Sequence, residues 1–358
     1  MAKHEETFAP SSSRAGHEGT VAGARMTANP ILVEVLRGGN LESRHRGAVA
    51  VTNADGAKLL AVGDVSARVF PRSAVKALQA LPLIESGAAE RYRLTDEELA
   101  LACASHSGEP AHVEGVASML AKAGLDASAL HCGAHWPISQ PAAFALAPTG
   151  QPSALHNNCS GKHAGFLCVA GAIGVEHADY WRPEHPVQRA VRAVLEDLSG
   201  DALTPELCAV DGCSVPTWAI PLQSIAHAFA RFGTGNGLAS ERARAAARLR
   251  AACARHPWHV AGTGRFCTEI MRLLRAHAFV KTGAEGVICA ALPQQGLGLA
   301  IKCDDGAGRA AEAIMAALIA RFLPLDPGER AAVTRYAQPT LRNWNGIEVG
   351  ALRVTEAL

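Results

Sequence analysis

Residues 71–76 read Pro-Arg-Ser-Ala-Val-Lys, and they lie where the sequence changes from strand-like to helix-like patterns. Ser73 and Lys76 are three residues apart, so on a helix their side chains share one face within reach of a hydrogen bond. Burial and the helix dipole at a helix start lower the pKa of a lysine, which would let Lys76 act as a neutral base toward Ser73. Such pairs also occur by chance on surface helices. The pair therefore predicts a nucleophilic serine only if other segments support it.

The patterns on either side of this segment predict one sheet built from both ends of the chain. After Ile31, short Val- and Leu-rich runs broken by Gly, Asn and Asp indicate antiparallel strands, and similar runs return late in the sequence. Ala- and Leu-rich runs of helical length lie between them. We predict an α/β protein: residues 27–72 and 256–358 form a discontinuous domain with an antiparallel sheet and flanking helices, and residues 73–255 form an inserted, mainly helical domain.

Local signals support this division. Thr95 followed by Glu98 has the pattern of a capping box at the start of a helix, and Gly124 after Lys122 is a helix stop signal. Residues 1–26 mix small, polar and charged residues with almost no apolar periodicity, so ordering them would bury little surface. We predict that this stretch is a flexible N-terminal tail.

The composition excludes several classes of protein. The 358 residues include 34 Lys plus Arg and 33 Asp plus Glu, and the net charge of +1 leaves no field that would hold a nucleic acid. No apolar run reaches the roughly 18 residues that span a bilayer, and the N-terminus is polar where a signal peptide is apolar. The ten cysteines are scattered, as is typical of reduced, buried thiols. We expect a cytoplasmic protein with no nucleic-acid or membrane partner.

Two further segments support chemistry at Ser73. Lys281-Thr282-Gly283 follows a predicted strand, and enzymes of the penicillin-binding and β-lactamase type pair this triplet with Ser-x-x-Lys. In this arrangement a cationic strand edge lies beside the nucleophile, and the glycine lets the substrate backbone approach closely. Residues 103–109, Cys-Ala-Ser-His-Ser-Gly-Glu, form a polar turn where those enzymes have a second serine. No organic cofactor is expected, because Gly296-Leu297-Gly298 joins predicted hairpin strands and opens no helix.

From about Ile31 to Val354, the chain resembles the rhizobial-type L-asparaginases, whose fold is similar to that of serine β-lactamases and glutaminases. The segments that carry the resemblance are RGGNLESRHRG (37–47), PRSAVK (71–76), CASHSGE (103–109), HNNCSGKHAGF (156–166), DGCSVP (211–216) and KTGAEG (281–286). Together these segments are specific, although no single one would be.

The resemblance implies an L-asparaginase that hydrolyses L-asparagine to L-aspartate and ammonia through an acyl-serine, and it suggests a homodimer. It assigns one catalytic dyad to Ser73 and Lys76 and a second to Ser105 and Lys281. The division of roles between the two dyads stays open. The implied substrate-binding residues are Arg72, Asp211 and His106. An aspartate suits the α-ammonium group, and an arginine suits either a carboxylate or a structural pair.

The resemblance also implies a zinc site formed by Cys159, Lys162 and Cys213. Thiolates suit zinc, but lysine is an unusual ligand because it must first lose a proton. Spacing alone would favour buried, inert cysteines instead. Ser214 departs from the glycine expected at this place in the family, which puts the local backbone in doubt.

Two alternative functions remain open at this point. A glutaminase, or an enzyme of the same fold that cleaves β-lactams or peptides, would share both dyads, although the segments at 156–166 and 211–216 favour an asparaginase. A non-catalytic asparagine sensor would be expected to have a broken dyad, and both dyads are intact here.

Overall fold

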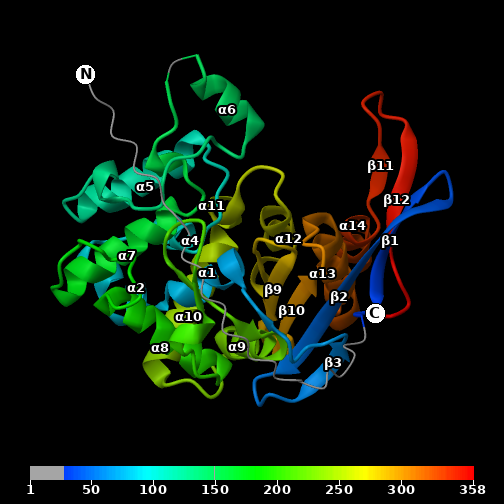
Figure 1. Ribbon diagram of the computed structural model, residues 1–358, viewed down its shortest axis with the longest axis horizontal. Helices are drawn as coiled ribbons and strands as arrows, with labels where there is room; N and C mark the ends of the chain where they lie inside the picture. Colours follow the sequence, from blue (N-terminus) through cyan, green and yellow to red (C-terminus); the bar gives the residue numbers. More distant parts are fainter. Residues whose placement is uncertain (1–27, 149) are drawn as a thin grey trace, which may run out of the picture.

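The computed structural model describes residues 28–148 and 150–358. The tail predicted over residues 1–26 lies outside the described residues. Figure 1 shows a group of helices on one side of the molecule and a sheet, with its own covering helices, on the other. The exact limits predicted for the helical insertion stay predictions.

The sheet is antiparallel and is assembled from both ends of the chain. Within the described residues it has eight strands. In spatial order these are β11 (Thr340–Arg342), β12 (Glu348–Val354), β1 (Ile31–Arg37), β2 (Asn40–Asn53), β10 (Leu297–Cys303), β9 (Val287–Leu292) and β8 (Phe279–Thr282), with β3 (Lys58–Val62) also paired to β2. All of these pairs are antiparallel. The predicted sheet is therefore confirmed.

The long strand β2 joins the two halves of the sheet. Its first half pairs with β1, and from Gly47 to Asn53 it pairs with β10, where Gly47 lies opposite Cys303. A Cβ atom on Gly47 would lie 2.4 Å from the carbonyl oxygen of Lys302. Only glycine fits this approach, so Gly47 lets one strand serve both halves.

The helices lie mainly between β4 and β8. They are α1 (Lys76–Gln79), α2 (Leu81–Glu85), α3 (Ala88–Arg91), α4 (Asp96–Ala102), α5 (Pro110–Lys122), α6 (Gln140–Leu146), α7 (Ser160–Ile173), α8 (Pro186–Ser199), α9 (Leu222–Thr234), α10 (Ser240–Arg255), α11 (Pro257–Ala261), α12 (Phe266–Leu274), α13 (Gly308–Phe322) and α14 (Pro327–Ala337). The predicted capping box at Thr95 and Glu98 is confirmed at the start of α4. Gly124 is left-handed, with a φ of +74°, just after α5.

Short elements complete the chain. They are the 3₁₀ turns η1 (Arg72–Val75), η2 (Ala127–Ala129), η3 (Ala154–His156), η4 (Pro205–Leu207), η5 (Arg275–His277) and η6 (Pro293–Gln295), and the strand pairs β4 (Arg68–Val69) with β7 (Ile220–Pro221) and β5 (Cys208–Val210) with β6 (Pro216–Trp218).

The core lies where helices pack on the centre of the sheet. Both α9 and α13 contact β9 and β10. Every residue of β9 is buried, as expected for a strand covered on both faces. A Cβ atom on Gly298 would lie 2.0 Å from the carbonyl oxygen of Ala226, so α9 packs directly against the backbone of β10. Each buried Val or Leu side chain contributes roughly 1.5–3 kcal/mol.

Helix α7 is buried along most of its length and packs closely on α4. A Cβ atom on Gly161 would lie 2.3 Å from the carbonyl oxygen of Leu101. This glycine lets the first turn of α7 touch the last turn of α4. The contact fixes the start of α7, which carries Lys162, against the end of α4, three residues before Ser105.

In the described part of the chain, no helix is both long enough and apolar enough to cross a membrane.

Candidate active site

Ser105 follows α4, and two lysine side chains donate hydrogen bonds to its hydroxyl oxygen. Lys76 Nζ donates to Ser105 Oγ at 3.0 Å, and Lys281 Nζ donates to the same oxygen at 2.8 Å. The backbone N–H of Ser105 donates to the carbonyl of Val260 at 3.0 Å, which fixes the segment against α11. All three side chains are buried, with at most 5% exposure. The structure thus joins three of the four predicted dyad residues in one buried chain of hydrogen bonds.

Lys281 is held on β8 in surroundings that favour its neutral form. Burial is the main cause that lowers its pKa, the charge of Lys76 lowers it further, and the pKa falls from its ordinary value of 10.5 to about 7. Besides Ser105, Lys281 Nζ donates only to the carbonyl of Thr282, at 2.8 Å, among the described residues. A lysine with this pKa can accept a proton near neutral pH.

Lys76 is the first residue of α1 and is fully buried. Its ammonium group donates to the carbonyls of Ala104 at 2.7 Å and Asn158 at 3.2 Å, in addition to Ser105. These three acceptors match the three donors of a lysine ammonium. They hold the amine between the segment after α4 and the start of α7.

Ser73 lies in η1, one turn before Lys76, and its side chain is partly exposed. In the described structure its hydroxyl makes no hydrogen bond, so the structure shows no bond between Ser73 and Lys76. The residue before it, Arg72, has a left-handed φ of 52°. Such a conformation in a residue other than glycine costs of order 1 kcal/mol and is often found at functional sites.

Gly283, the third residue of the Lys-Thr-Gly triplet, packs against the Ser73 turn. A Cβ atom here would lie 2.6 Å from the carbonyl oxygen of Pro71 and 3.1 Å from the backbone nitrogen of Ala74. We expected this glycine to admit the substrate backbone, but the atoms that need the space belong to the chain itself. The glycine therefore brings the end of β8 against the Ser73 turn.

Arg72 and Asp211 form an ion pair next to this turn. Arg72 Nε donates to Asp211 Oδ1 at 2.5 Å, and the same oxygen accepts the N–H of Gly212 at 2.7 Å. Burial by itself raises the pKa of Asp211, but Lys162 and Arg72 outweigh it and lower the pKa overall. Among the described residues Asp211 Oδ2 has no hydrogen-bond donor, so this ionised oxygen is available to a ligand.

The three residues of the implied zinc site converge. Lys162 Nζ donates to Cys213 Sγ at 3.1 Å, and the Cys213 thiol is in hydrogen-bond contact with Cys159. Two donors on a tetrahedral zinc would lie roughly 3.6 Å apart, and the separation of 3.1 Å between Lys162 Nζ and Cys213 Sγ is close to this spacing. No group of three or more His, Cys, Asp or Glu side chains that could hold a metal ion converges in the described ranges, so the zinc site stays a prediction.

The contact between the two cysteines shifts their pKa values in opposite directions. The hydrogen bond from Cys213 is the main cause that lowers the pKa of Cys159 well below its usual value, and the charges of Lys76 and Lys162 assist. The same bond and burial raise the pKa of Cys213. Burial alone would lower the pKa of Lys162, but Cys213, Cys159 and Asp211 raise it. Zinc would therefore have to displace protons from Lys162 and Cys213.

The family model described as L-asparaginase II matches residues 33–354. The chain belongs to the L-asparaginase II family. This membership supports an amidohydrolase that acts on a small-molecule substrate. No curated protein matches the chain significantly.

Solved structures similar to this L-asparaginase II family member include two described as β-lactamases. A β-lactamase from Mycobacterium bovis is 14% identical, with 77% of this chain and 94% of that chain covered and a TM-score of 0.41. A putative β-lactamase from Bacteroides dorei is also 14% identical, with 72% and 84% covered and a TM-score of 0.37. The protein called Mglu is 14% identical, with 78% and 68% covered and a TM-score of 0.37.

His106, implied as a substrate-binding residue, follows Ser105 in the sequence and is fully buried. Its Nδ1 accepts the N–H of Gly108 at 3.1 Å, so Nε2 carries the proton and faces Ser160 Oγ at 2.9 Å. Burial lowers the pKa of the ring well below its usual value. Both nitrogens are thus occupied inside the protein, and contact with substrate stays a prediction.

Two aromatic rings that sequence analysis did not assign to the site, those of His112 and Trp258, form a stack with the ring of His106. His112 stacks on His106 with ring centroids 5.0 Å apart, and Trp258 stacks on His112 at 4.0 Å. The only sequence signal for this stack is the spacing of His106 and His112, six residues apart. The stack ties the Ser105 segment to α5 and α11.

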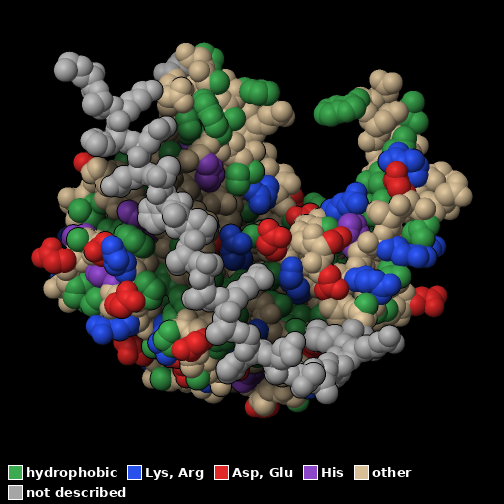
Figure 2. Space-filling view, in the orientation of Figure 1, with side chains coloured by type: hydrophobic (Ala, Val, Ile, Leu, Met, Phe, Trp, Pro, Cys, Tyr) green, Lys and Arg blue, Asp and Glu red, His purple; other side chains and the backbone are tan. Residues whose placement is uncertain are grey.

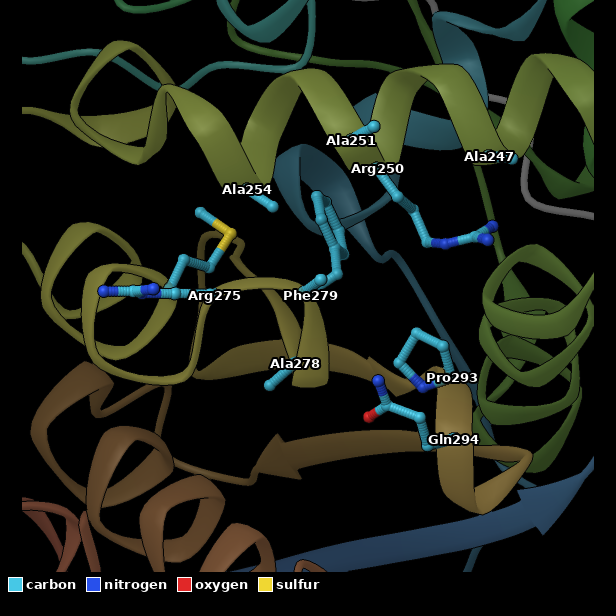
Figure 3. Close-up of a pocket in the computed structure, with 11 residues that line it drawn as sticks. Ala247, Arg250, Ala251, Ala254, Arg275, Ala278, Phe279, Pro293 and Gln294 are labelled. Carbon is cyan, nitrogen blue, oxygen red and sulfur yellow. The ribbon is translucent and has the colours of Figure 1, made fainter.

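A separate cavity of about 260 Å³ lies between α10 and the start of β8 (Figure 3). Its walls include alanines of α10, Phe279 and Pro293, with Arg250 and Arg275 toward opposite sides. None of the predicted site residues lines it. This cavity is therefore distinct from the hydrogen-bonded centre at Ser105.

Proposed function

We propose that this L-asparaginase II family member hydrolyses the side-chain amide of L-asparagine through an acyl-serine. The observation that carries the proposal is the hydrogen-bonded chain from Lys76 through Ser105 to Lys281, in which Lys281 has a pKa of about 7. A buried amine that is partly neutral near pH 7 is the base that activation of a serine needs.

The proposed first step makes Lys76 a base for Ser73. For this step the hydrogen bond between Ser105 and Lys281 reverses, so that the Ser105 hydroxyl donates to neutral Lys281. Lys281 then takes the Ser105 hydroxyl proton while Ser105 takes one from the Lys76 ammonium, so Lys76 becomes neutral and Ser105 is unchanged. Lys76 can then accept the proton of Ser73 as Ser73 Oγ attacks the amide carbon. The N–H of Ser73, which has no partner within the described residues, is available to the oxyanion.

The second half of the reaction returns the enzyme to its starting state. The proton that Lys76 took passes to the amide nitrogen, the carbon–nitrogen bond breaks, and ammonia leaves the β-aspartyl ester on Ser73. Lys281 first returns its proton through Ser105 to Lys76, so Lys281 is neutral again. A water molecule then attacks the ester while Lys281 takes one of its protons through Ser105, and the Lys76 ammonium gives a proton to Ser73 Oγ as the ester bond breaks and L-aspartate forms. Transfer of the proton from Lys281 through Ser105 to Lys76 restores the starting state. We assign activation of this water to Ser105 and Lys281, because their hydrogen bond does not involve Ser73.

We assign the α-ammonium group of the substrate to Asp211. Its Oδ1 is engaged by Arg72 and Gly212, and Oδ2 has no donor among the described residues. Arg72 then serves as the structural partner of the aspartate. A charged hydrogen bond of this kind contributes about 1.5–3 kcal/mol.

We also propose that Cys159, Lys162 and Cys213 hold a zinc ion. The supporting observation is their convergence within hydrogen-bond distance in a buried setting. When bound, zinc would act as a fixed positive charge that draws these segments together. The three residues themselves connect α7 to the turn that bears Asp211, which orients the carboxylate.

The test is ammonia release from L-asparagine and L-glutamine, run beside hydrolysis of a chromogenic β-lactam, on the purified wild-type protein. The proposal expects ammonia from asparagine with a clear preference over glutamine. A preference for glutamine would identify a glutaminase, and β-lactam cleavage without ammonia would identify a different acyl-serine hydrolase. Asparagine binding by calorimetry without turnover would identify a sensor.

A further inference from the structure

L-asparagine carries an α-carboxylate, and the cations described so far already have partners. Arg72 is paired with Asp211 at 2.5 Å. Lys76 has three acceptors, and Lys162 donates to Cys213. Lys281 faces Ser105 and is partly neutral near pH 7. The proposed site therefore lacks a cation for one charged group of its substrate.

Arg265 lies next to the catalytic centre and has no carboxylate partner. It immediately precedes α12, and its Nη1 donates to Ser107 Oγ at 3.3 Å, two residues after Ser105. Its positive charge is close enough to contribute to the lowered pKa of Lys281. Among the described residues Arg265 forms no salt bridge. The charge of Arg265 also acts to lower the pKa of Glu312, but the two side chains form no ion pair.

The segment that carries Arg265 is fixed in place. Glu109 accepts the backbone N–H of Thr263 at 2.9 Å and its hydroxyl at 2.8 Å. Trp258 Nε1 also donates to Thr263 Oγ1, at 3.0 Å. Gly262 has a φ of +117°, and a Cβ atom there would lie 2.6 Å from Glu109 Oε1. The start of α12 is thus held against the loop that carries Ser105, so ordering Arg265 on binding costs little entropy.

The surface leaves this region open to a ligand. Figure 2 shows a hollow between the α6 segment and the β11–β12 hairpin, with charged side chains of both signs across its floor. The connection from α11 to α12, which contains Arg265, lies between the α6 segment and the β11–β12 hairpin in Figure 1.

We propose that Arg265 binds the α-carboxylate of the amino-acid substrate. This inference rests on the proposed function and deepens it. Arg265 presents a planar guanidinium that suits a carboxylate, and Asp211 presents a carboxylate oxygen that suits an ammonium group. Arg265 and Asp211 together bind both charged groups on the α-carbon of the substrate. The enzyme then selects free α-amino acids and discriminates against simple amides.

The test compares two substrates that differ only in this carboxylate. L-asparagine has it, and 3-aminopropanamide is the same molecule without it. In the wild type, loss of the carboxylate should lower kcat/KM by about 100-fold, the scale of a charged hydrogen-bonded pair. Arg265→Met should lower kcat/KM for asparagine by a similar factor, mainly through KM. The same variant should change kcat/KM for 3-aminopropanamide by less than about threefold, because that substrate has no group to lose.

Controls separate binding from folding. Arg272→Met removes an exposed arginine of α12 that pairs with Glu269, and it should leave activity on both substrates unchanged. Arg265→Lys keeps the charge and should restore part of the preference for asparagine, which also keeps the test valid if Arg265→Met does not fold. An equal loss on both substrates, or no loss on asparagine, would overturn the inference. A wild type that releases no ammonia from asparagine would instead refute the proposed function itself.

Discussion

Replacing Lys281 with methionine should change how the stability of the protein depends on pH and should remove its activity. The side chain is 1% exposed, and the folded protein lowers the pKa of Lys281 from 10.5 to about 7. Between these two values the unfolded chain binds a proton that the folded protein does not. Wild-type stability must therefore rise as the pH rises through this window, with a limiting slope of about 1.4 kcal/mol per pH unit.

The size of the effect follows from the two pKa values. From pH 7 to pH 9 the wild type should gain about 2 kcal/mol from Lys281 alone. Methionine does not titrate, so the variant lacks this gain. Loss of the donor to Thr282 and Ser105 costs about 1–3 kcal/mol per unpaired group, but that cost is the same at both pH values. The stability of the variant relative to wild type should therefore fall by about 2 kcal/mol over this range.

Urea unfolding of both proteins at pH 7, 8 and 9 measures this difference. Lys58→Met is the matched control, because Lys58 is exposed and should give a profile parallel to that of wild type. Ammonia release by Lys281→Met should fall at least about a thousandfold. Parallel stability profiles for Lys281→Met and wild type would refute the buried, neutral lysine on which the mechanism depends.

The other predictions concern the nucleophile, the metal and one strained residue. Ser73→Ala and Ser105→Ala should each lower kcat by at least about a thousandfold; acid quenching of the wild type during turnover, followed by mass spectrometry, should find an acyl group on Ser73, and an acyl group on Ser105 would exchange the roles. Elemental analysis should find about one zinc per chain, and the Cys159→Ser, Cys213→Ser double variant should lose it; zinc that persists would place the metal elsewhere. Ser214 has a left-handed φ of 76°, so Ser214→Gly should stabilise the protein by about 0.5 kcal/mol; an unchanged or lower thermal midpoint would contradict this.

The sequence predicted the main elements because their signals are local. The capping box at Thr95 and Glu98 is read within four residues and is confirmed. The expectation of glycine in place of Ser214 agrees with the left-handed backbone found there. By contrast, α14 was not predicted, although Asp326 and Glu329 form a capping box at its start. That helix has few buried apolar residues, so its periodic pattern is weak.

The contacts of the site were harder to predict because they are not local. Spacing placed Ser73 and Lys76 on one face, but the long side chain of Lys76 reaches Ser105, 29 residues away in sequence. The Lys-Thr-Gly triplet indicated a strand, yet only the structure shows that its glycine is required by Pro71. Arg265 belongs to no motif that sequence analysis recognised. Its position depends on the two hydrogen bonds that Thr263 donates to Glu109.

The pairing of β2 with β10 also affects how the chain folds while it is being synthesised. Val49 and Val51 of β2 lie opposite Ile301 and Leu299, about 250 residues further along the chain. A ribosome adds roughly 5–20 residues per second, so β2 leaves the ribosome many seconds before its partner strand is made. During that delay an apolar strand has an unpaired edge, which is the kind of surface that aggregates or recruits chaperones. Slower translation or higher temperature should therefore lower the yield of folded protein even in variants whose finished fold is fully stable.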